Sequence, residues 1–469
     1  MLSLIWYFFV DKKNFLILLK YFNNNCYHNN NNISVINDIN YYIKQINQTT
    51  NNVIFLSTNN PNKFISVFFA SILTKSSIFL LNPHWQKREL EQVYQIVKPN
   101  LVFTDSDNHN NHKQFLLLLK RVKDGNILTT NEDIENHCYP SERIMIPTGG
   151  TSGKVKFAIH TWLTLTNSAM GFYEFWQEEK INSFCCLPLY HVSGLMQIIR
   201  TFMTKGTLEI YDYSLLKKEV PLNNYQDFFI SLVPTQLKFF LENNPNWLIP
   251  FKTVLVGGNS TPQDLQNLCH NYQINLALTY GMTETASGVT ILSPDNFLNG
   301  KKSSGKVLPH AEINIEKKEE QTGKITIKST SLFKGYYPHS QDYSYFETDD
   351  LGYLDQENYL HIVGRNSRKI ISGGENIYPS EIEELIRETG LVKDIVILGK
   401  KDSYWGQVIC ALYVPMSENI IDSIKNKLRS HISHYKIPKV WYEMDSIPRN
   451  AQGKIDYCYL TTIISEKSN

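Results

Sequence analysis

A glycine-rich segment holds the first residues whose types and spacing could bind a ligand. It runs Thr148-Gly149-Gly150-Thr151-Ser152-Gly153-Lys154, and Lys156 follows two residues later. Glycines let backbone N–H groups wrap an oxyanion, while hydroxyls and a lysine add donors and positive charge. A Walker A loop is excluded, because Thr148 and Val155 stand where that motif needs a glycine and a Ser or Thr. The segment therefore predicts a polyphosphate cradle, with an ordinary tight connection as the alternative.

A second segment with a usable carboxylate and hydroxyls is Tyr280-Gly281-Met282-Thr283-Glu284-Thr285, which follows an expected strand at 276–279. Open α/β sheets bind ligands at the carboxyl ends of their strands. A carboxylate at such a place can hold Mg²⁺ against phosphate oxygens, and hydroxyls can contact the phosphate itself. The alternative is a polar strand-to-loop turn.

Three further segments could complete a nucleotide site. Residues 347–353 (ETDDLGY), followed by Gly364-Arg365, offer a carboxylate for ribose hydroxyls, or else an acidic surface turn. Residues 371–383 (ISGGENIYPSEIE) form a Gly-rich turn before a helix, where Ser380 and Glu383 fit a capping box. Residues 448–454 (PRNAQGK) end in Lys454, which could be a reactive-site cation or simply a solvated lysine.

The elements around these segments alternate between strand and helix up to about residue 300. Apolar runs predict strands and helices at the following residues: strands 53–56, 77–81, 101–104, 143–146, 229–233 and 253–256, with helices at 63–73 and 235–241 and from Pro262. This order implies layered sheets with helices outside. Period-two alternation in 311–315 and 324–328 predicts a β-hairpin. Shorter elements after Gly364 place a domain boundary near 364–367.

Composition narrows the class of protein. The chain has 469 residues, 42% hydrophobic and 19% charged, which fits a globular enzyme of two or more domains. A net charge of +1 gives no basic field that would recruit nucleic acid. Seven cysteines without a CxxC pair favour free thiols in a reducing compartment, with Cys185 and Cys186 buried in a strand. The apolar runs within residues 2–19 are too short for a membrane span and predict a packed amphipathic helix.

Together, the order and spacing of the five segments resemble the core motifs of the adenylate-forming superfamily, which includes acyl-CoA synthetases, peptide-synthetase adenylation domains and luciferases. The resemblance covers residues 50–460. It implies an α/β fold with a large N-terminal domain (1–364) of two βαβ-type subdomains plus a β-subdomain. A small mobile C-terminal α+β domain (365–469) would carry the catalytic lysine.

The resemblance also implies roles for individual residues. The segment 148–156, including Thr148, Gly149, Gly150, Thr151, Ser152, Gly153 and Lys154, would close over the phosphates of ATP. The walls of the adenine and acyl pockets would include Gly257, Gly258 and Tyr280, with Gly281 near the acid. Thr283 would contact the α-phosphate, and Glu284 would bind Mg²⁺.

The remaining implied roles concern ribose binding and domain movement. Asp350, assisted by Arg365, would bind the ribose. Lys454 would reach the acyl-phosphate oxygens while the acid attacks the α-phosphorus and pyrophosphate leaves, because charge must be neutralised where it accumulates. The C-terminal domain would then rotate and offer Gly373-Gly374 to the pantetheine arm of coenzyme A. The hinge departs from the family, since Ser367 stands where Asp or Lys is usual.

Several short stretches resemble o-succinylbenzoate–CoA ligases of photosynthetic lineages, which serve phylloquinone or menaquinone synthesis: residues 81–85 (LNPHW), 157–162 (FAIHTW) and 187–195 (LPLYHVSGL). Arg200 in the following apolar stretch could bind a second substrate carboxylate, or pair with an acidic residue of the protein. His191 could line the aromatic ring of the substrate or touch its carboxylate, or it could be a satisfied core histidine.

Alternatives at the level of function are another aryl- or fatty-acyl-CoA synthetase and a non-enzymatic nucleotide-binding homologue. We expect no nucleic acid partner and no stable membrane insertion. The sequence does not determine the oligomeric state, and a homodimer is one alternative. Bacterial cytoplasm and plastid stroma both fit the composition.

Overall fold

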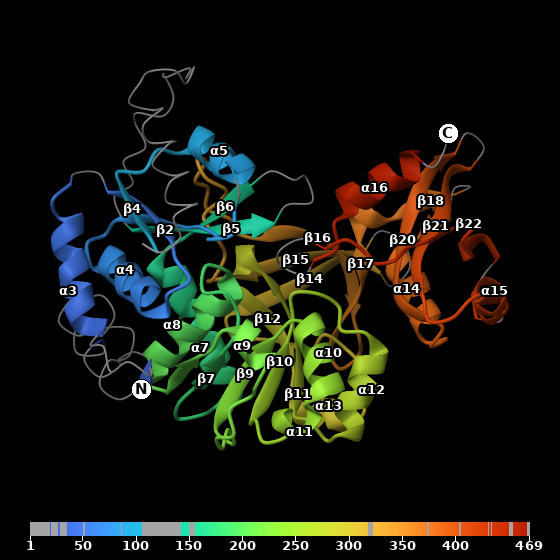
Figure 1. Cartoon of the computed structure of the whole chain (residues 1–469), viewed down its shortest axis with the longest axis horizontal. Coiled ribbons are helices and arrows are strands. Elements are labelled where there is room, and N and C mark those ends of the chain that lie inside the picture. Colours follow the sequence, from blue (N-terminus) through green and yellow to red (C-terminus); the bar gives the residue numbers. More distant parts are fainter. Residues whose placement is uncertain are drawn as a thin grey trace.

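The computed structural model describes most of the chain: residues 19, 27–28, 35–49, 52–85, 87–105, 142–149, 155–317, 322–372, 375–402, 405–429, 431–432, 434–449 and 454–466. It is a mixed α/β protein with a large N-terminal part and a small C-terminal part, drawn at the right of Figure 1. The predicted fold class is confirmed. The amphipathic helix expected within residues 2–19 lies almost wholly outside the described residues.

The first sheet has five strands in the order β4-β2-β3-β5-β6. Its elements are β2 (Val53–Ser57), β3 (Ser77–Leu80), β4 (Leu101–Thr104), β5 (Arg143–Gly149) and β6 (Val155–His160), with helices α3 (Val35–Ile46), α4 (Pro61–Leu73) and α5 (Lys87–Ile96). The strands β2 to β5 are parallel, and β6 returns antiparallel to β5. Because β5 and β6 flank the Gly-rich segment, they fix both of its ends.

The second sheet has eight strands in the order β1-β8-β7-β9-β10-β11-β12-β13. Its strands are β1 (Tyr27–His28), β7 (Asn182–Cys185), β8 (Leu208–Ile210), β9 (Phe228–Leu232), β10 (Thr253–Val256), β11 (Leu276–Met282), β12 (Ser287–Leu292) and β13 (Lys306–Val307). Its helices are α7 (Trp162–Trp176), α8 (Val192–Thr204), α9 (Tyr213–Leu216), α10 (Pro234–Asn243), α11 (Pro245–Leu248), α12 (Gln263–Asn271) and α13 (Pro294–Leu298).

Two predictions from the sequence can be compared with the elements of this second sheet. Cys185 and Cys186 are buried at the end of β7, as expected. The helix predicted from Pro262 begins one residue later, at Gln263, because Pro262 has the extended ψ of 146° that belongs to an N-cap.

The β-subdomain is an antiparallel sheet of four strands: β14 (Ala311–Lys317), β15 (Gly323–Ser329), β16 (Phe346–Leu354) and β17 (Leu360–Arg365). The hairpin expected at 311–328 is confirmed as β14 and β15, with Ile313 opposite Ile327 in the ladder. In Figure 1 this sheet lies between the second sheet and the C-terminal part. Its strand β16 brings the acidic segment 347–353 towards the centre of the molecule.

The C-terminal part has its own hydrophobic core, built mainly from isoleucines such as Ile382, Ile395 and Ile424. Its elements are β18 (Ile370–Ser372), β19 (Glu375–Ile377), α14 (Pro379–Arg387), β20 (Val392–Asp402), β21 (Gly406–Pro415), α15 (Ile421–Arg429), β22 (Val440–Glu443) and α16 (Tyr457–Glu466). A unit with its own core can keep its fold while it changes orientation.

No helix within the described ranges combines the length and the apolar character that crossing a bilayer requires.

Candidate active site

The turn after β11 forms the centre of the candidate site. Thr283 and Glu284 lie in a short 3₁₀ turn between β11 and β12. The backbone then passes through φ of 53° at Ala286 and 94° at Ser287, which is unusual for residues other than glycine. Such conformations persist only where surrounding contacts hold them.

Those contacts come from four donors that bind four successive carbonyl oxygens of the turn, those of residues 283 to 286. His160 Nε2 lies 2.7 Å from the Thr283 carbonyl, and the Phe333 N–H donates to Glu284 at 2.9 Å. The hydroxyls of Ser331 and Ser168 donate to the carbonyls of Thr285 and Ala286. The turn is therefore held from several elements at once.

Gly281 makes the close approach of β11 and β12 possible before this turn. The pairing register shifts between Tyr280 and Gly281. A Cβ at Gly281 would lie 2.0 Å from the carbonyl oxygen of Ser287, so any side chain there would push the strands apart.

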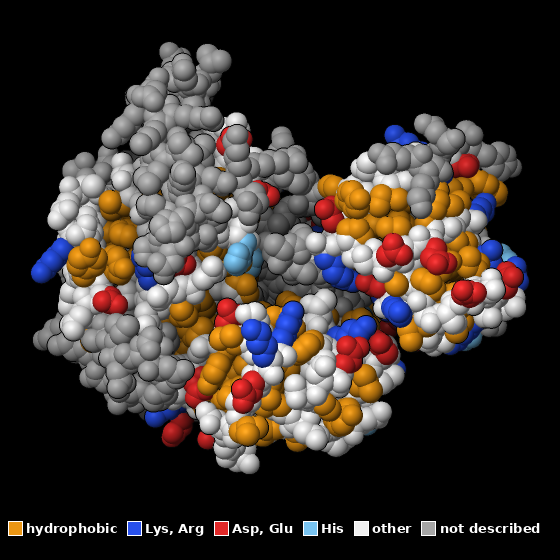
Figure 2. All heavy atoms as spheres, in the orientation of Figure 1, with side chains coloured by type: hydrophobic (Ala, Val, Ile, Leu, Met, Phe, Trp, Pro, Cys, Tyr) orange, Lys and Arg blue, Asp and Glu red, His pale blue; other side chains and the backbone are white. Residues whose placement is uncertain are grey.

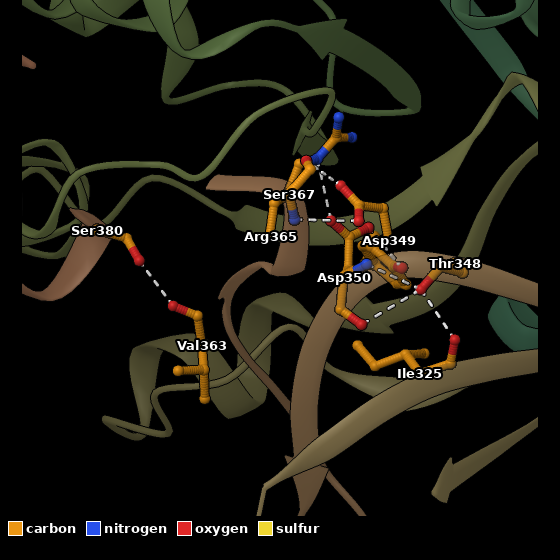
Figure 3. Close-up of polar contacts among 9 residues, drawn as sticks. Ile325, Thr348, Asp349, Asp350, Val363, Arg365, Ser367 and Ser380 are labelled. Atoms are coloured by element: carbon orange, nitrogen blue, oxygen red, sulfur yellow. Dashed lines mark hydrogen bonds and ion pairs between the residues drawn. The ribbon is translucent and has the colours of Figure 1, made fainter. Parts of the chain in front are cut away.

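Asp350 on β16 is a buried carboxylate that is fixed at both oxygens. Tyr280 Oη donates to Oδ2 at 2.8 Å, and Arg365 Nε donates to Oδ1 at 3.1 Å (Figure 3 labels Asp350 and Arg365). Burial and the neighbouring Asp350 charge raise the pKa of the Tyr280 phenol, so it remains a donor. The structure thus brings residues of β11, β16 and β17 together in one cluster.

Glu284 is oriented by Tyr336, whose hydroxyl donates to Oε1 at 2.6 Å. Burial and the Glu284 charge raise the pKa of Tyr336, which keeps the hydroxyl protonated. The described residues contain no cluster of three or more His, Cys, Asp or Glu that could hold a metal alone. Mg²⁺ needs no such cluster, since it binds through one or two carboxylates together with substrate phosphates. The donor set at Glu284 and Thr283 therefore fits Mg²⁺.

Lys454, just before α16, comes from the C-terminal part to residues of the N-terminal part. Burial lowers its pKa, and the Arg365 charge lowers it further, while Glu284 acts in the opposite direction. Lys454 also contributes, after burial, to lowering the pKa of His191 to about 4. The lysine is therefore within electrostatic range of all three residues, although its side chain keeps exposed surface. Figure 2 shows the hollow between the two parts, with Lys and Arg side chains at its edge.

Other predicted residues lie at strand ends or outside the described part. Gly257 and Gly258 follow β10, the neighbour of β11, and Gly258 has φ of +80°. Thr148 and Gly149 end β5. The predictions on Gly150, Thr151, Ser152, Gly153, Lys154, Gly373 and Gly374 fall outside the described residues.

Arg200 lies buried in α8 and faces aromatic and hydroxyl groups. Its Nη2 donates to Ser287 Oγ at 3.1 Å, and its guanidinium carbon is 3.9 Å from the centre of the Phe172 ring. Among the described residues Arg200 forms no ion pair, and its Nε and both ring nitrogens of His310 are buried without a hydrogen-bond partner. Burial lowers the pKa of Arg200 to about 9, and burial and Arg200 lower that of His310 to about 4. The guanidinium of Arg200 is therefore a buried positive charge without a carboxylate partner among the described residues.

The segment that joins the two parts is held by Asp349 (Figure 3). The Asp349 carboxylate accepts from the Ser367 N–H at 3.1 Å and from the Ser367 hydroxyl. Asp349 and Asp350 are adjacent on β16, and the Asp349 side chain is exposed whereas that of Asp350 is buried. One carboxylate faces the candidate nucleotide site and the other contacts the connecting segment.

The expected capping box at Ser380 and Glu383 is wrong. The Ser380 hydroxyl donates to the Val363 carbonyl at 2.6 Å, and Glu383 forms a 2.9 Å ion pair with Arg368 (Figure 3 draws the Ser380 contact). Both side chains therefore contact residues near the connecting segment instead of capping the helix as the local sequence had indicated.

Four residues of the site were not found from sequence: His160, Tyr336, His310 and Ser287. The sequence carries a signal for two of them: His160 is a histidine in an apolar strand, and Ser287 is a polar residue close to the Thr283 turn. No signal identifies Tyr336, which lies 52 residues from Glu284.

Comparison with known proteins agrees with this geometry. Residues 42–337 match the AMP-binding enzyme family, and residues 381–454 match the AMP-binding enzyme C-terminal domain. A 2-succinylbenzoate–CoA ligase of Lactococcus lactis is 32% identical over 442 residues, 90% of this chain and 92% of that protein.

Two solved structures of o-succinylbenzoate CoA synthetase from Bacillus subtilis have the same fold at 24% identity. The complex with the acyl-adenylate intermediate has a TM-score of 0.79, covering 94% of this chain and 97% of that one. The complex with ATP and magnesium ion has a TM-score of 0.78, covering 94% and 98%.

The fold and the site define an adenylate-forming enzyme. This chain belongs to the AMP-binding enzyme family.

Proposed function

We propose that this AMP-forming acid–CoA ligase activates 2-succinylbenzoate, an aromatic dicarboxylate, and transfers it to coenzyme A. The observation that carries the choice of acid is the buried guanidinium of Arg200, which has no carboxylate partner among the described residues. An uncompensated buried charge is costly, so the site favours an anionic ligand. The name of the Lactococcus lactis relative supports the same acid.

In the first half-reaction a substrate carboxylate oxygen attacks the α-phosphorus of ATP, and pyrophosphate leaves. Both reactants are anionic, so the positive charge of Lys454 and the hydroxyl of Thr283 act where negative charge builds up. Asp350 would accept the ribose hydroxyls, with Tyr280 and Arg365 fixing its orientation. Glu284 would hold Mg²⁺, which supplies charge neutralisation at the phosphates.

In the second half-reaction the thiol of coenzyme A attacks the acyl carbonyl, and AMP leaves. Lys454 belongs to the C-terminal part, so a rotation of that part would withdraw it and open the acyl-adenylate to the thiol. Support for a rotation comes from the separate core of the C-terminal part and the short connection at Ser367.

The experiment that tests the function is AMP release from ATP and Mg²⁺ in the presence of coenzyme A and a panel of acids. The panel contains 2-succinylbenzoate, benzoate, 4-coumarate, and medium and long fatty acids. We expect selective turnover of 2-succinylbenzoate. Turnover of another acid alone would keep the ligase and reject the substrate, whereas ATP binding without turnover on any acid would favour a non-enzymatic homologue.

The place of this reaction follows from its substrate. Activation of 2-succinylbenzoate would place the enzyme in naphthoquinone synthesis, towards menaquinone or phylloquinone. The cytoplasmic or plastid-stromal location and the homodimer remain predictions.

A further inference from the structure

His160 is fully buried at the end of β6, yet both of its ring nitrogens have partners. Its Nε2 lies 2.7 Å from the carbonyl oxygen of Thr283, and its Nδ1 lies 3.0 Å from Thr164 Oγ1. Burial lowers the pKa of His160 to about 4, so the ring is neutral at physiological pH. A fully buried histidine placed against the turn that carries Thr283 and Glu284 has no part in the reaction described above.

The tautomer of this ring follows from its partners. A carbonyl oxygen only accepts hydrogen bonds, so Nε2 carries the hydrogen, and Nδ1 of the neutral ring is left as an acceptor 3.0 Å from Thr164 Oγ1. Thr164 is held in turn by the start of α7, where its oxygen accepts from the Thr161 N–H at 3.1 Å and its own N–H donates to Thr161 Oγ1 at 3.2 Å. The Thr283 carbonyl therefore fixes which nitrogen of His160 donates, and the helix cap holds the hydroxyl that lies against the other nitrogen.

The position of His160 in the fold joins two candidate phosphate-binding segments. His160 ends β6, the strand that follows residues 150–154 and pairs with β5 from Gly149 opposite Val155. Its donor reaches the first carbonyl of the Thr283 turn, 123 residues away in the chain. Of the four donors that hold the turn, His160 alone comes from the sheet that anchors the Gly-rich segment.

We propose that His160 is a positioning residue for adenylation: its neutral Nε2–H holds the Thr283 carbonyl and so sets the direction of the Thr283 hydroxyl and the Glu284 carboxylate. The inference rests on the proposed roles of those two residues. A displacement of the turn by a fraction of an ångström would move both groups relative to the phosphates, where geometry has large effects on rate.

Two variants of His160 distinguish the effect of losing the Nε2–H donor from the effect of losing the imidazole ring. His160→Leu fills similar volume without a donor, whereas His160→Gln offers an amide N–H near the place of Nε2. We expect His160→Leu to lower the adenylation rate and raise the KM for MgATP, together on the order of 10–100-fold, as for groups that orient ligands from behind. His160→Gln should recover most of this loss. Thioester formation from preformed acyl-adenylate should stay within about threefold in both, because pyrophosphate has left before that step and no phosphoryl attack has to be aligned by the Glu284 side of the turn.

The controls address folding and the underlying assignment. Ser71→Ala removes another buried side-chain hydrogen bond, to Phe68 in α4, and should change neither half-reaction. An equal loss in both half-reactions of His160→Leu, or no recovery in His160→Gln, would show that His160 is structural only. If Glu284→Gln leaves the KM for MgATP and the Mg²⁺ dependence unchanged, the proposed role of the turn fails regardless of His160.

Discussion

Lys454 is the residue whose removal separates the two half-reactions most sharply. It comes from the C-terminal part to Glu284 and Arg365 in the N-terminal part. Lys454→Ala should lower the adenylation rate by about 10²–10³, the cost of one lost transition-state donor. Pyrophosphate exchange measures this step, and thioester formation from preformed acyl-adenylate should change much less. An equal loss in both steps would contradict the two-state picture.

The pH dependence of adenylation should report the same lysine. Burial lowers the pKa of Lys454 below its usual 10.5, so its charged form is lost at a lower pH than that of a free lysine. The adenylation rate should therefore fall on the alkaline side before pH 10.5. In Lys454→Arg the side chain stays charged, and this alkaline limb should disappear even if the rate is lower. Persistence of the limb would assign it to another group.

Arg200 should decide the preference for a second carboxylate. Arg200→Met keeps most of the buried volume and the contact with Phe172 but removes the charge. We expect the KM for 2-succinylbenzoate to rise on the order of 10–100-fold, because a hydrogen bond to a charged group contributes about 1.5–3 kcal/mol. The KM for benzoate, which lacks the second carboxylate, should change little. An unchanged KM for the dicarboxylate would reject the recognition role.

At the scale of elements, the contact between β16 and the connecting segment should bias the orientation of the C-terminal part. The Asp349 carboxylate accepts two hydrogen bonds from Ser367, one from the backbone and one from the side chain. These groups are exposed, so together they are worth about 1 kcal/mol. Asp349→Ala should lower the ratio of adenylation rate to thioester rate about fivefold. Ser367→Ala removes one bond only and should have a smaller effect in the same direction. A shift in the opposite sense in either variant would refute the bias.

At the scale of the whole molecule, acid should destabilise the fold through buried neutral histidines. Burial lowers the pKa of His160, His191 and His310 to about 4, below the usual 6.5. The unfolded chain therefore binds more protons between pH 6.5 and 4, so the stabilisation is complete above pH 6.5 and is lost as the pH falls towards 4. His160 alone would lower the free energy of unfolding by up to about 3 kcal/mol as the pH falls from 6.5 to 4. Urea unfolding at pH 7 and pH 5 measures the change, and His160→Gln should weaken it.

Much of the fold could be predicted because it depends on local pattern. Short apolar runs followed by helical segments predicted β2, β3, β9 and β10, and period-two alternation predicted the β14–β15 hairpin. The strand order could not be predicted, since pairing such as that of β7 with β9 depends on crossovers that no local pattern encodes.

The site divides in the same way. Residues within strands or directly after them, such as Thr283, Asp350 and Arg365, could be named from their motifs. The groups that orient them could not, because Tyr336 and His160 reach the Thr283 turn across long stretches of chain. Ser380 shows that a local pattern can also mislead: its hydroxyl was expected to cap its own helix, but it donates to the distant Val363 carbonyl.

The adjacent carboxylates on β16 carry a consequence for how such sequences can vary. Asp350 serves the nucleotide side and Asp349 the joint, so the two positions are under different constraints although they are neighbours. An acidic residue at position 367 would face Asp349 with like charge, which is destabilising. Positions 349 and 367 should therefore change together across relatives: where position 367 is acidic, position 349 should be neutral. Position 350 should stay an aspartate.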